Sequence, residues 1–269
     1  MQGTARNTFF VVVLLIQATS VFAQDALTLG IFPYASTDKL IKHQKELKNY
    51  LAQGMGKPIS ISTAKDFKTF INMAKHGKYD LVYSAPHFAR LLDKEYGYKR
   101  IAMTTHHIQG EFITLKSSPY KNLQELRNKT IALAPPLAIL TQLAIKELAD
   151  AGLKANKDYT IVTMKNFENA MLSVFNGDSD VALAGKKLWR LLPPRYKDKL
   201  RIIAPTQPIP GFIIMAKPNM DQGTVKNLQQ LSLSFNQTPA GKKYLFQGLK
   251  LIDEAAMQGL DEFVPILKK

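Results

Sequence analysis

The stretch YDLVYSAPHFARLL, residues 79–92, predicts the fold class of this 269-residue chain. Residues 80–83 (DLVY) predict a buried strand with apolar Leu81 and Val82, and the loop SAPH follows. Residues 88–92 then begin a pattern with helical spacing. A strand that leads directly into a helix is the repeating unit of α/β folds, so we expect that class here.

The same alternation extends towards the N-terminus. Residues 27–32 (LTLGIF) and 59–61 predict strands, and residues 39–53 and 66–76 predict helices that end at glycines. Strands that alternate with helices are typical of parallel strands joined by helical crossovers.

A second series with this alternation begins near residue 129, after an extended segment at 107–115. We expect strands at 129–134, 159–164 and 180–184, and helices at 139–151 and 168–175. Another extended segment covers 201–215, and only helical patterns follow, at 224–236, 240–246 and after 253.

Two similar series separated by extended segments predict two lobes that the chain crosses twice. Lobe 1 would comprise residues 24–110 plus 205–269, and lobe 2 residues 111–204, with a hinge near Glu111 and Gly211. The alternative is one continuous doubly wound sheet.

The first 23 residues have the features of a cleaved Sec signal peptide. Arg6 is basic, residues 9–16 (FFVVVLLI) are wholly apolar, and Val21 and Ala23 are small residues before a cleavage site. Eight apolar residues are far fewer than the roughly 20 that span a bilayer. No cysteine follows for lipid attachment. We therefore predict a free periplasmic protein.

The composition favours anionic partners but excludes several kinds of chemistry. The formal charge is +15, which attracts anions at long range. The lysines are dispersed along the chain, however, and a nucleic-acid footprint needs clustered charge, so we expect no nucleic-acid partner. The chain has no cysteine, which excludes disulfides and thiolate chemistry.

No sequence motif points to catalysis. The chain has no G-x-S-x-G, Walker, H-E-x-x-H or G-x-G-x-x-G pattern, so we expect neither an enzyme nor a cofactor. His106 and His107 are adjacent, and on a strand they would point to opposite faces. We therefore expect no metal site.

Five stretches resemble the phosphate/phosphonate-type periplasmic solute-binding proteins of ABC transporters. They are LTLGIFPY at 27–34, AKDF at 64–67, YDLVYSAPHF at 79–88, SSPYKNLQELRNKTIAL at 117–133 and NGDSDVAL at 176–183. The resemblance covers nearly all of the mature chain. It implies a two-lobed type II periplasmic-binding fold, a ligand cleft between the lobes, and an ABC permease as partner.

The loops after four strands are the candidate binding site, because ligands of open α/β sheets lie beyond the carboxyl ends of the strands. The candidate ligand-binding residues are Tyr34, Tyr83, Ser84, His87, Leu137, Ala138, Thr141 and Phe167. Tyr83 matches by position an aromatic residue of the family's cleft. Tyr34 could instead pack at a lobe edge, His87 could be structural, and Asn166 is explained better as a helix N-cap.

The loop before the first helix of lobe 2 differs from the family pattern. Phosphonate-binding members carry a Ser-Thr-Ser-Gly-like loop there, whereas residues 135–140 read PPLAIL, with no hydroxyl before Thr141. The two prolines also remove two N–H donors. The helix start keeps a partial positive charge. We therefore expect a ligand that is larger or less charged than phosphate.

The expected function is capture of a small, anionic ligand for an ABC importer by a monomeric periplasmic protein. Phosphonate itself is doubtful because of the altered loop. The alternative is a periplasmic component that reports its ligand to a membrane sensor kinase.

Overall fold

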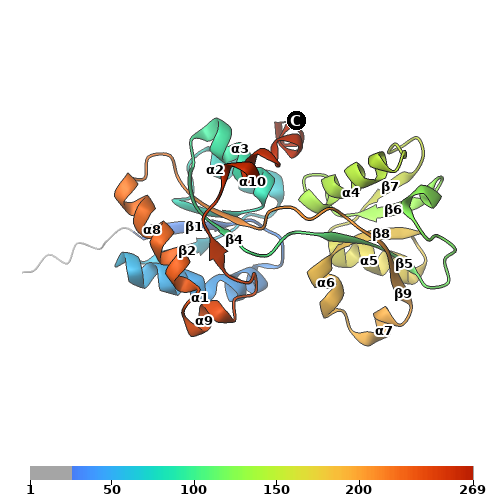
Figure 1. Ribbon diagram of the computed structural model, residues 1–269, viewed down its shortest axis with the longest axis horizontal. Helices are drawn as coiled ribbons and strands as arrows, with labels where there is room; N and C mark the ends of the chain where they lie inside the picture. Colours follow the sequence, from blue (N-terminus) through green and yellow to red (C-terminus); the bar gives the residue numbers. More distant parts are fainter. Residues whose placement is uncertain (1–25, 269) are drawn as a thin grey trace, which may run out of the picture.

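The computed structural model describes residues 26–268, which form two β-sheets, each covered by helices (Figure 1). We call these parts the six-stranded half and the five-stranded half. The predicted signal peptide lies outside the described residues. Among residues 26–268, none of the helices is both long enough and apolar enough to cross a membrane.

The sheet of the six-stranded half combines strands from both ends of the chain. Its strands are β1 (Leu27–Ile31), β2 (Ile59–Ser62), β3 (Leu81–Ser84), β4 (Lys99–Thr104), β10 (Ile213–Ala216) and β11 (Leu249–Lys250), in the order β11-β4-β10-β3-β1-β2. β1 pairs in parallel with β2 and β3, as the alternation predicts. β10 is antiparallel to both of its neighbours, β3 and β4. The C-terminal part of the chain therefore completes the N-terminal sheet.

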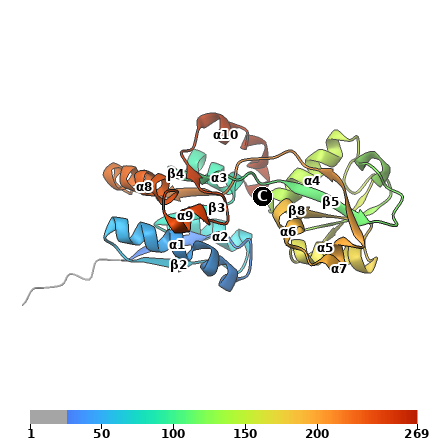
Figure 2. The same ribbon diagram turned by 60° about the horizontal axis from the view of Figure 1, so that its bottom comes forward.

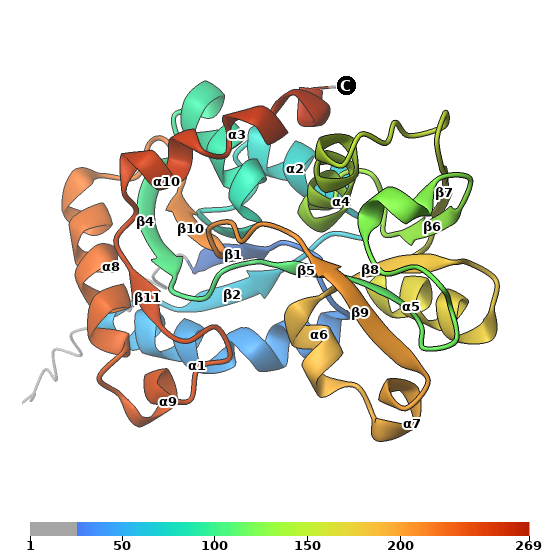
Figure 3. The same cartoon turned by 45° about the vertical axis from the view of Figure 1, so that its right-hand side comes forward.

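Helices cover both faces of this sheet (Figures 1 and 3). α1 (Thr37–Met55), α8 (Gln222–Phe235) and α9 (Pro239–Lys242) lie on one face, and α2 (Phe67–Lys75), α3 (Pro86–Tyr96) and α10 (Glu254–Gln258) lie on the other. α1 buries Leu40, Leu47 and Leu51, whose spacing places them on one side of a helix. It ends at Gly56, which adopts a left-handed φ of 62°.

The five-stranded half repeats the α/β pattern. Its strands are β5 (Gly110–Leu115), β6 (Thr130–Leu133), β7 (Thr160–Thr163), β8 (Val181–Gly185) and β9 (Leu200–Pro205), in the order β7-β6-β8-β5-β9. α4 (Ile139–Asp150) lies on one face, and α5 (Phe167–Asn176), α6 (Lys186–Leu191) and α7 (Pro194–Lys197) lie on the other (Figures 1 and 2). Short 3₁₀ helices occur at Leu123–Leu126, Asp261–Phe263 and Pro265–Lys268.

Two extended segments, residues 105–109 and 206–212, join the halves. Ile108 and Ile209 pair across these crossings through two backbone hydrogen bonds of 3.0 and 2.9 Å. Glu111, expected near the hinge, instead belongs to β5. Gly211 lies in the second crossing, where a Cβ atom would collide with the Thr104 hydroxyl and a backbone carbonyl. The exact division into lobes and the hinge motion stay predictions.

The structure differs from the sequence-based interpretation in three respects. The strands form two sheets, so the alternative of one continuous sheet is wrong. β4 was not predicted, because its antiparallel partner β10 comes from a distant part of the chain. The helix predicted at 240–246 ends at Lys242, and β11 follows. Tyr244 and Phe246 are both buried with half-buried Leu245 between them, which is a two-residue period.

Candidate ligand-binding cleft

A pocket of about 90 Å³ lies between the two halves. It is lined by Phe32, Tyr34, Phe67, Ala85 and Phe212 from the six-stranded half, Ala138, Ile139, Leu140 and Phe167 from the five-stranded half, and Ile108 from a crossing. Most of these residues lie where a strand ends or the next helix begins. The pocket therefore occupies the position where α/β sheets bind ligands.

Aromatic rings form one wall of the pocket. The rings of Phe32 and Phe67 stack with their centroids 4.6 Å apart, and those of Tyr34 and Phe212 are 4.8 Å apart. Phe212 directly precedes β10, so the antiparallel insertion of that strand brings its ring beside Tyr34. The wall is apolar and preformed, as is usual in small-molecule sites.

The structure brings three of the predicted site residues to the pocket: Tyr34, Ala138 and Phe167. Leu137 lies in the same loop, half-buried beside Ala138. The pocket is also lined by residues outside the predicted set: Phe32, Phe67, Ala85, Ile108, Ile139, Leu140 and Phe212. The strand-end rule could have identified Phe32 and Phe67, because Phe32 ends the strand predicted at 27–32 and Phe67 follows the strand predicted at 59–61. No local pattern could have identified Phe212.

Tyr83 is fully buried beneath Tyr34 and Phe212. Its hydroxyl lies 3.4 Å from the hydroxyl of Tyr244, which in turn donates to Gln44 Oε1 at 2.8 Å. Burial raises the pKa of Tyr83 well above its usual value, so the phenol stays protonated. In this arrangement Tyr83 supports the aromatic wall from behind, and its contact with a ligand stays a prediction.

The hydroxyls of Ser84 and Thr141 are engaged within the protein. Ser84 Oγ donates to the carbonyl of Ala85 at 3.2 Å, and Thr141 Oγ1 donates to the carbonyl of Ala134 at 3.0 Å. Both side chains are buried. A ligand would have to compete with these bonds for either hydroxyl hydrogen.

His87 links the two halves from a fully buried position. Its Nε2 atom lies 3.0 Å from the carbonyl oxygen of Leu137, and its ring stacks on Phe88 at 4.4 Å. Burial lowers the pKa of His87 to about 4, so the ring is neutral at pH 7. Because a carbonyl only accepts, Nε2 carries the proton, and the buried Nδ1 has no partner among the described residues.

Helix starts give the cleft a positive potential. α2 and α5 are capped by the side chains of Asp66 and Asn166, which confirms the cap predicted at Asn166. The N-cap residues of α3 and α4 are Ala85 and Ala138, which supply no side-chain cap and both line the pocket. The first N–H groups of a helix lack intrahelical partners and carry partial positive charge. The beginnings of α3 and α4 therefore favour an anionic group.

The chain matches known proteins over most of its length. A family model described as "ABC transporter, phosphonate, periplasmic substrate-binding protein" matches residues 29–257. Two similar structures are XAC2383 from Xanthomonas citri bound to ATP (22% identity, TM-score 0.77, covering 90% of this chain and 98% of that one) and PhnD1 from Prochlorococcus marinus in complex with methylphosphonate (15%, 0.79, 91% and 98%).

A third similar structure is a binding protein component of an ABC phosphonate transporter from Pseudomonas aeruginosa. It is 17% identical, with a TM-score of 0.74, and the match covers 91% of this chain and 87% of that one. At these identities the structures establish the fold, which is the predicted type II periplasmic-binding fold. Since the family model matches most of its residues, the chain belongs to the phosphonate-type periplasmic substrate-binding proteins of ABC transporters.

Proposed function

We propose that the protein captures a small anionic ligand with hydrocarbon surface in the interlobe cleft and delivers it to an ABC permease, without catalysing a reaction. The observation that carries this proposal is an apolar, aromatic pocket at the start of two helices that lack side-chain caps. The family description supports import rather than the alternative sensing role. Secretion through a cleaved signal peptide and a monomeric state are parts of the same proposal.

The size of the pocket limits how a ligand can enter. A volume of about 90 Å³ is well below the roughly 300–1,000 Å³ of typical small-molecule sites. A larger ligand requires the halves to separate, and the paired crossings at Ile108 and Ile209 are the natural hinge. Exposed contacts such as the 3.4 Å ion pair of Lys39 with Glu168 resist this motion only weakly.

Phosphate and simple alkylphosphonates are expected to bind poorly, with a Kd weaker than about 10 µM, or about −7 kcal/mol. A tetrahedral dianion needs several charge-assisted donors. Pro135 and Pro136 have no N–H, and the Thr141 hydroxyl already donates to a backbone carbonyl. Calorimetry with phosphate and methylphosphonate tests this expectation. A submicromolar Kd for either would contradict it.

A thermal-shift screen of small carboxylates, phosphate esters and phosphonates tests the binding function itself. A ligand that binds the folded state raises Tm by mass action. The best compound should bind about tenfold or more weaker to Phe167→Ala, which removes one aromatic wall of the pocket.

Phe175→Ala is the matched control. Phe175 is equally half-buried on the same helix, but it packs against Tyr196, away from the pocket. Equal loss of affinity in the two variants, or no loss in either, would place the ligand outside this cleft.

A further inference from the structure

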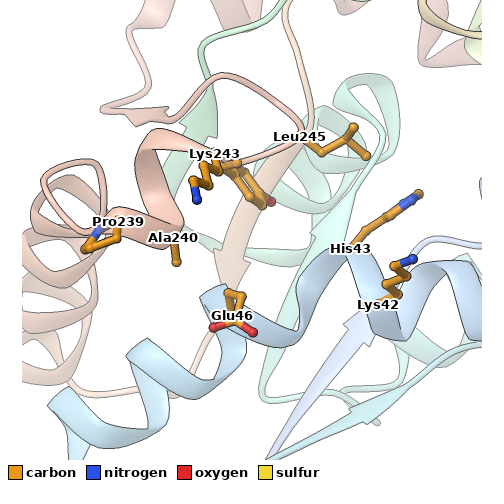
Figure 4. Close-up of a pocket in the computed structure, with 8 residues that line it drawn as sticks. Lys42, His43, Glu46, Pro239, Ala240, Lys243 and Leu245 are labelled. Carbon is orange, nitrogen blue, oxygen red and sulfur yellow. The ribbon is translucent and has the colours of Figure 1, made fainter. Parts of the chain in front are cut away.

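A second, larger groove opens between α1 and the segment around α9 (Figure 4). Its volume is about 410 Å³, within the roughly 300–1,000 Å³ range of small-molecule sites. Lys42, His43 and Glu46 come from α1, and Pro239, Ala240, Lys243, Tyr244 and Leu245 come from α9 and the residues after it. This groove shares no lining residue with the cleft pocket.

The polar groups of the groove are predominantly cationic. Lys42 and Lys243 lie on opposite walls, and neither forms an ion pair with a carboxylate of the described residues. Glu46 is the single acidic side chain among the lining residues. The groove therefore has two available ammonium groups above a mainly apolar floor.

A chain of buried hydrogen bonds adds a third donor. Tyr244 OH donates to Gln44 Oε1 at 2.8 Å, so the Gln44 amide nitrogen faces Tyr34 OH at 3.5 Å and donates to it. His43 Nδ1, 3.2 Å away, is then the acceptor among the described residues for the Tyr34 hydroxyl hydrogen, and we assign the donation in that direction. This direction leaves the proton of the neutral His43 ring on Nε2, where it is available as a donor.

The five-stranded half contributes a further cation at the edge of the groove. Lys187 of α6 donates to the carbonyl of Leu245, and its ammonium lies 5.0 Å from the centroid of the Phe246 ring. The pKa of His43 is lowered mainly by burial. The positive charges of Lys187, Lys39 and Lys42 lower it further. These neighbouring positive charges repel one another, and a bound anion would reduce this repulsion.

We propose that this groove is an accessory site for a small multivalent anion of the polyphosphate or phosphate-ester class, separate from the interlobe cleft. Two ammonium groups on facing walls can each bind a different phosphoryl or carboxylate group of one molecule. A monovalent anion would engage only one of them, and at an exposed position that contact is largely screened by salt. Two ammonium groups on facing walls therefore favour a multivalent anion.

Titration with inorganic tripolyphosphate at fixed ionic strength tests the proposal. The double variant Lys42→Ala/Lys243→Ala should weaken binding about tenfold or more. The matched control is Lys45→Ala/Lys242→Ala, which removes one lysine from α1 and one directly before Lys243 without touching the groove lining. This control should change the affinity by less than about twofold, because its charges are solvated and screened.

Two further variants separate the groove from the cleft and from general surface charge. Glu46→Gln should strengthen tripolyphosphate binding about two- to fivefold, because it removes the one repulsive carboxylate. Phe167→Ala, which alters only the cleft, should leave the affinity unchanged. Equal weakening by both lysine pairs, no weakening by either, or loss of binding in Phe167→Ala would each overturn the proposal.

Discussion

Replacing Arg90 with methionine is expected to lower the free energy of unfolding by about 2–4 kcal/mol. The side chain of Arg90 is 8% exposed, and its guanidinium holds both oxygens of Asp261, at 2.7 and 3.1 Å, and Asp93 at 3.0 Å. Methionine keeps the apolar stem but leaves half-buried Asp93 with only Arg100. The loss also removes the two-point contact between α3 and Asp261, which then keeps only the 3.4 Å ion pair with Lys94.

Equilibrium unfolding in urea measures this loss. The control is Lys146→Met, which breaks ion pairs with Asp150 and Glu262, whose side chains are 62% and 52% exposed. These exposed pairs should together contribute less than about 1 kcal/mol because water screens them. Comparable decreases in the free energy of unfolding in both variants would show that the buried Arg90 guanidinium stabilises the fold no more than an exposed ion pair does.

Lowering the pH from 6.5 to 4 is expected to decrease the free energy of unfolding because of His87. The decrease is about 1.4 kcal/mol per pH unit, up to a total of about 3 kcal/mol. Burial lowers the pKa of His87 from 6.5 to about 4 in the folded state. Between these two pKa values His87 is protonated in the unfolded chain but neutral in the folded chain, so the free energy of unfolding falls as the pH falls. The contribution is fully present above about pH 6.5 and fully lost below about pH 4.

Urea unfolding at pH 7, 6 and 5 should therefore show a falling midpoint. His87→Gln, whose amide can still donate to the Leu137 carbonyl, should reduce the slope. Part of the slope should remain, because burial also lowers the pKa of His106 to about 4. His76→Gln, on the surface of α2's C-terminal end, is the control and should keep the full slope. An unchanged slope in His87→Gln would contradict this assignment.

Local sequence patterns were sufficient to predict most of the helices and parallel strands. α1 follows from the spacing of Leu40, Leu47 and Leu51, and the caps at Asp66 and Asn166 follow from residue type and position. These features depend on residues a few positions apart, so the sequence alone contains the information. The position of the cleft was predictable for the same reason, because strand ends locate it.

The composition of the cleft was only partly predictable. The loops that carry Tyr34, Ala138 and Phe167 were identified from the sequence, and these residues do line the pocket. Phe212 was not, because it reaches the pocket only through the insertion of β10 between β3 and β4. The antiparallel partner of a strand depends on contacts between distant segments, which hydrophobic periodicity does not encode.

Only the tertiary structure determines which polar residues are exposed and which are buried behind a binding surface. Tyr83 appeared suited to a ligand, yet its hydroxyl lies beside Tyr244, 161 residues further along the chain. The basic groove likewise exists only because Tyr244 packs against Gln44, 200 residues away, which brings Lys243 opposite Lys42. A sequence pattern determines which face of an element is apolar, whereas packing in three dimensions determines which distant element covers that face.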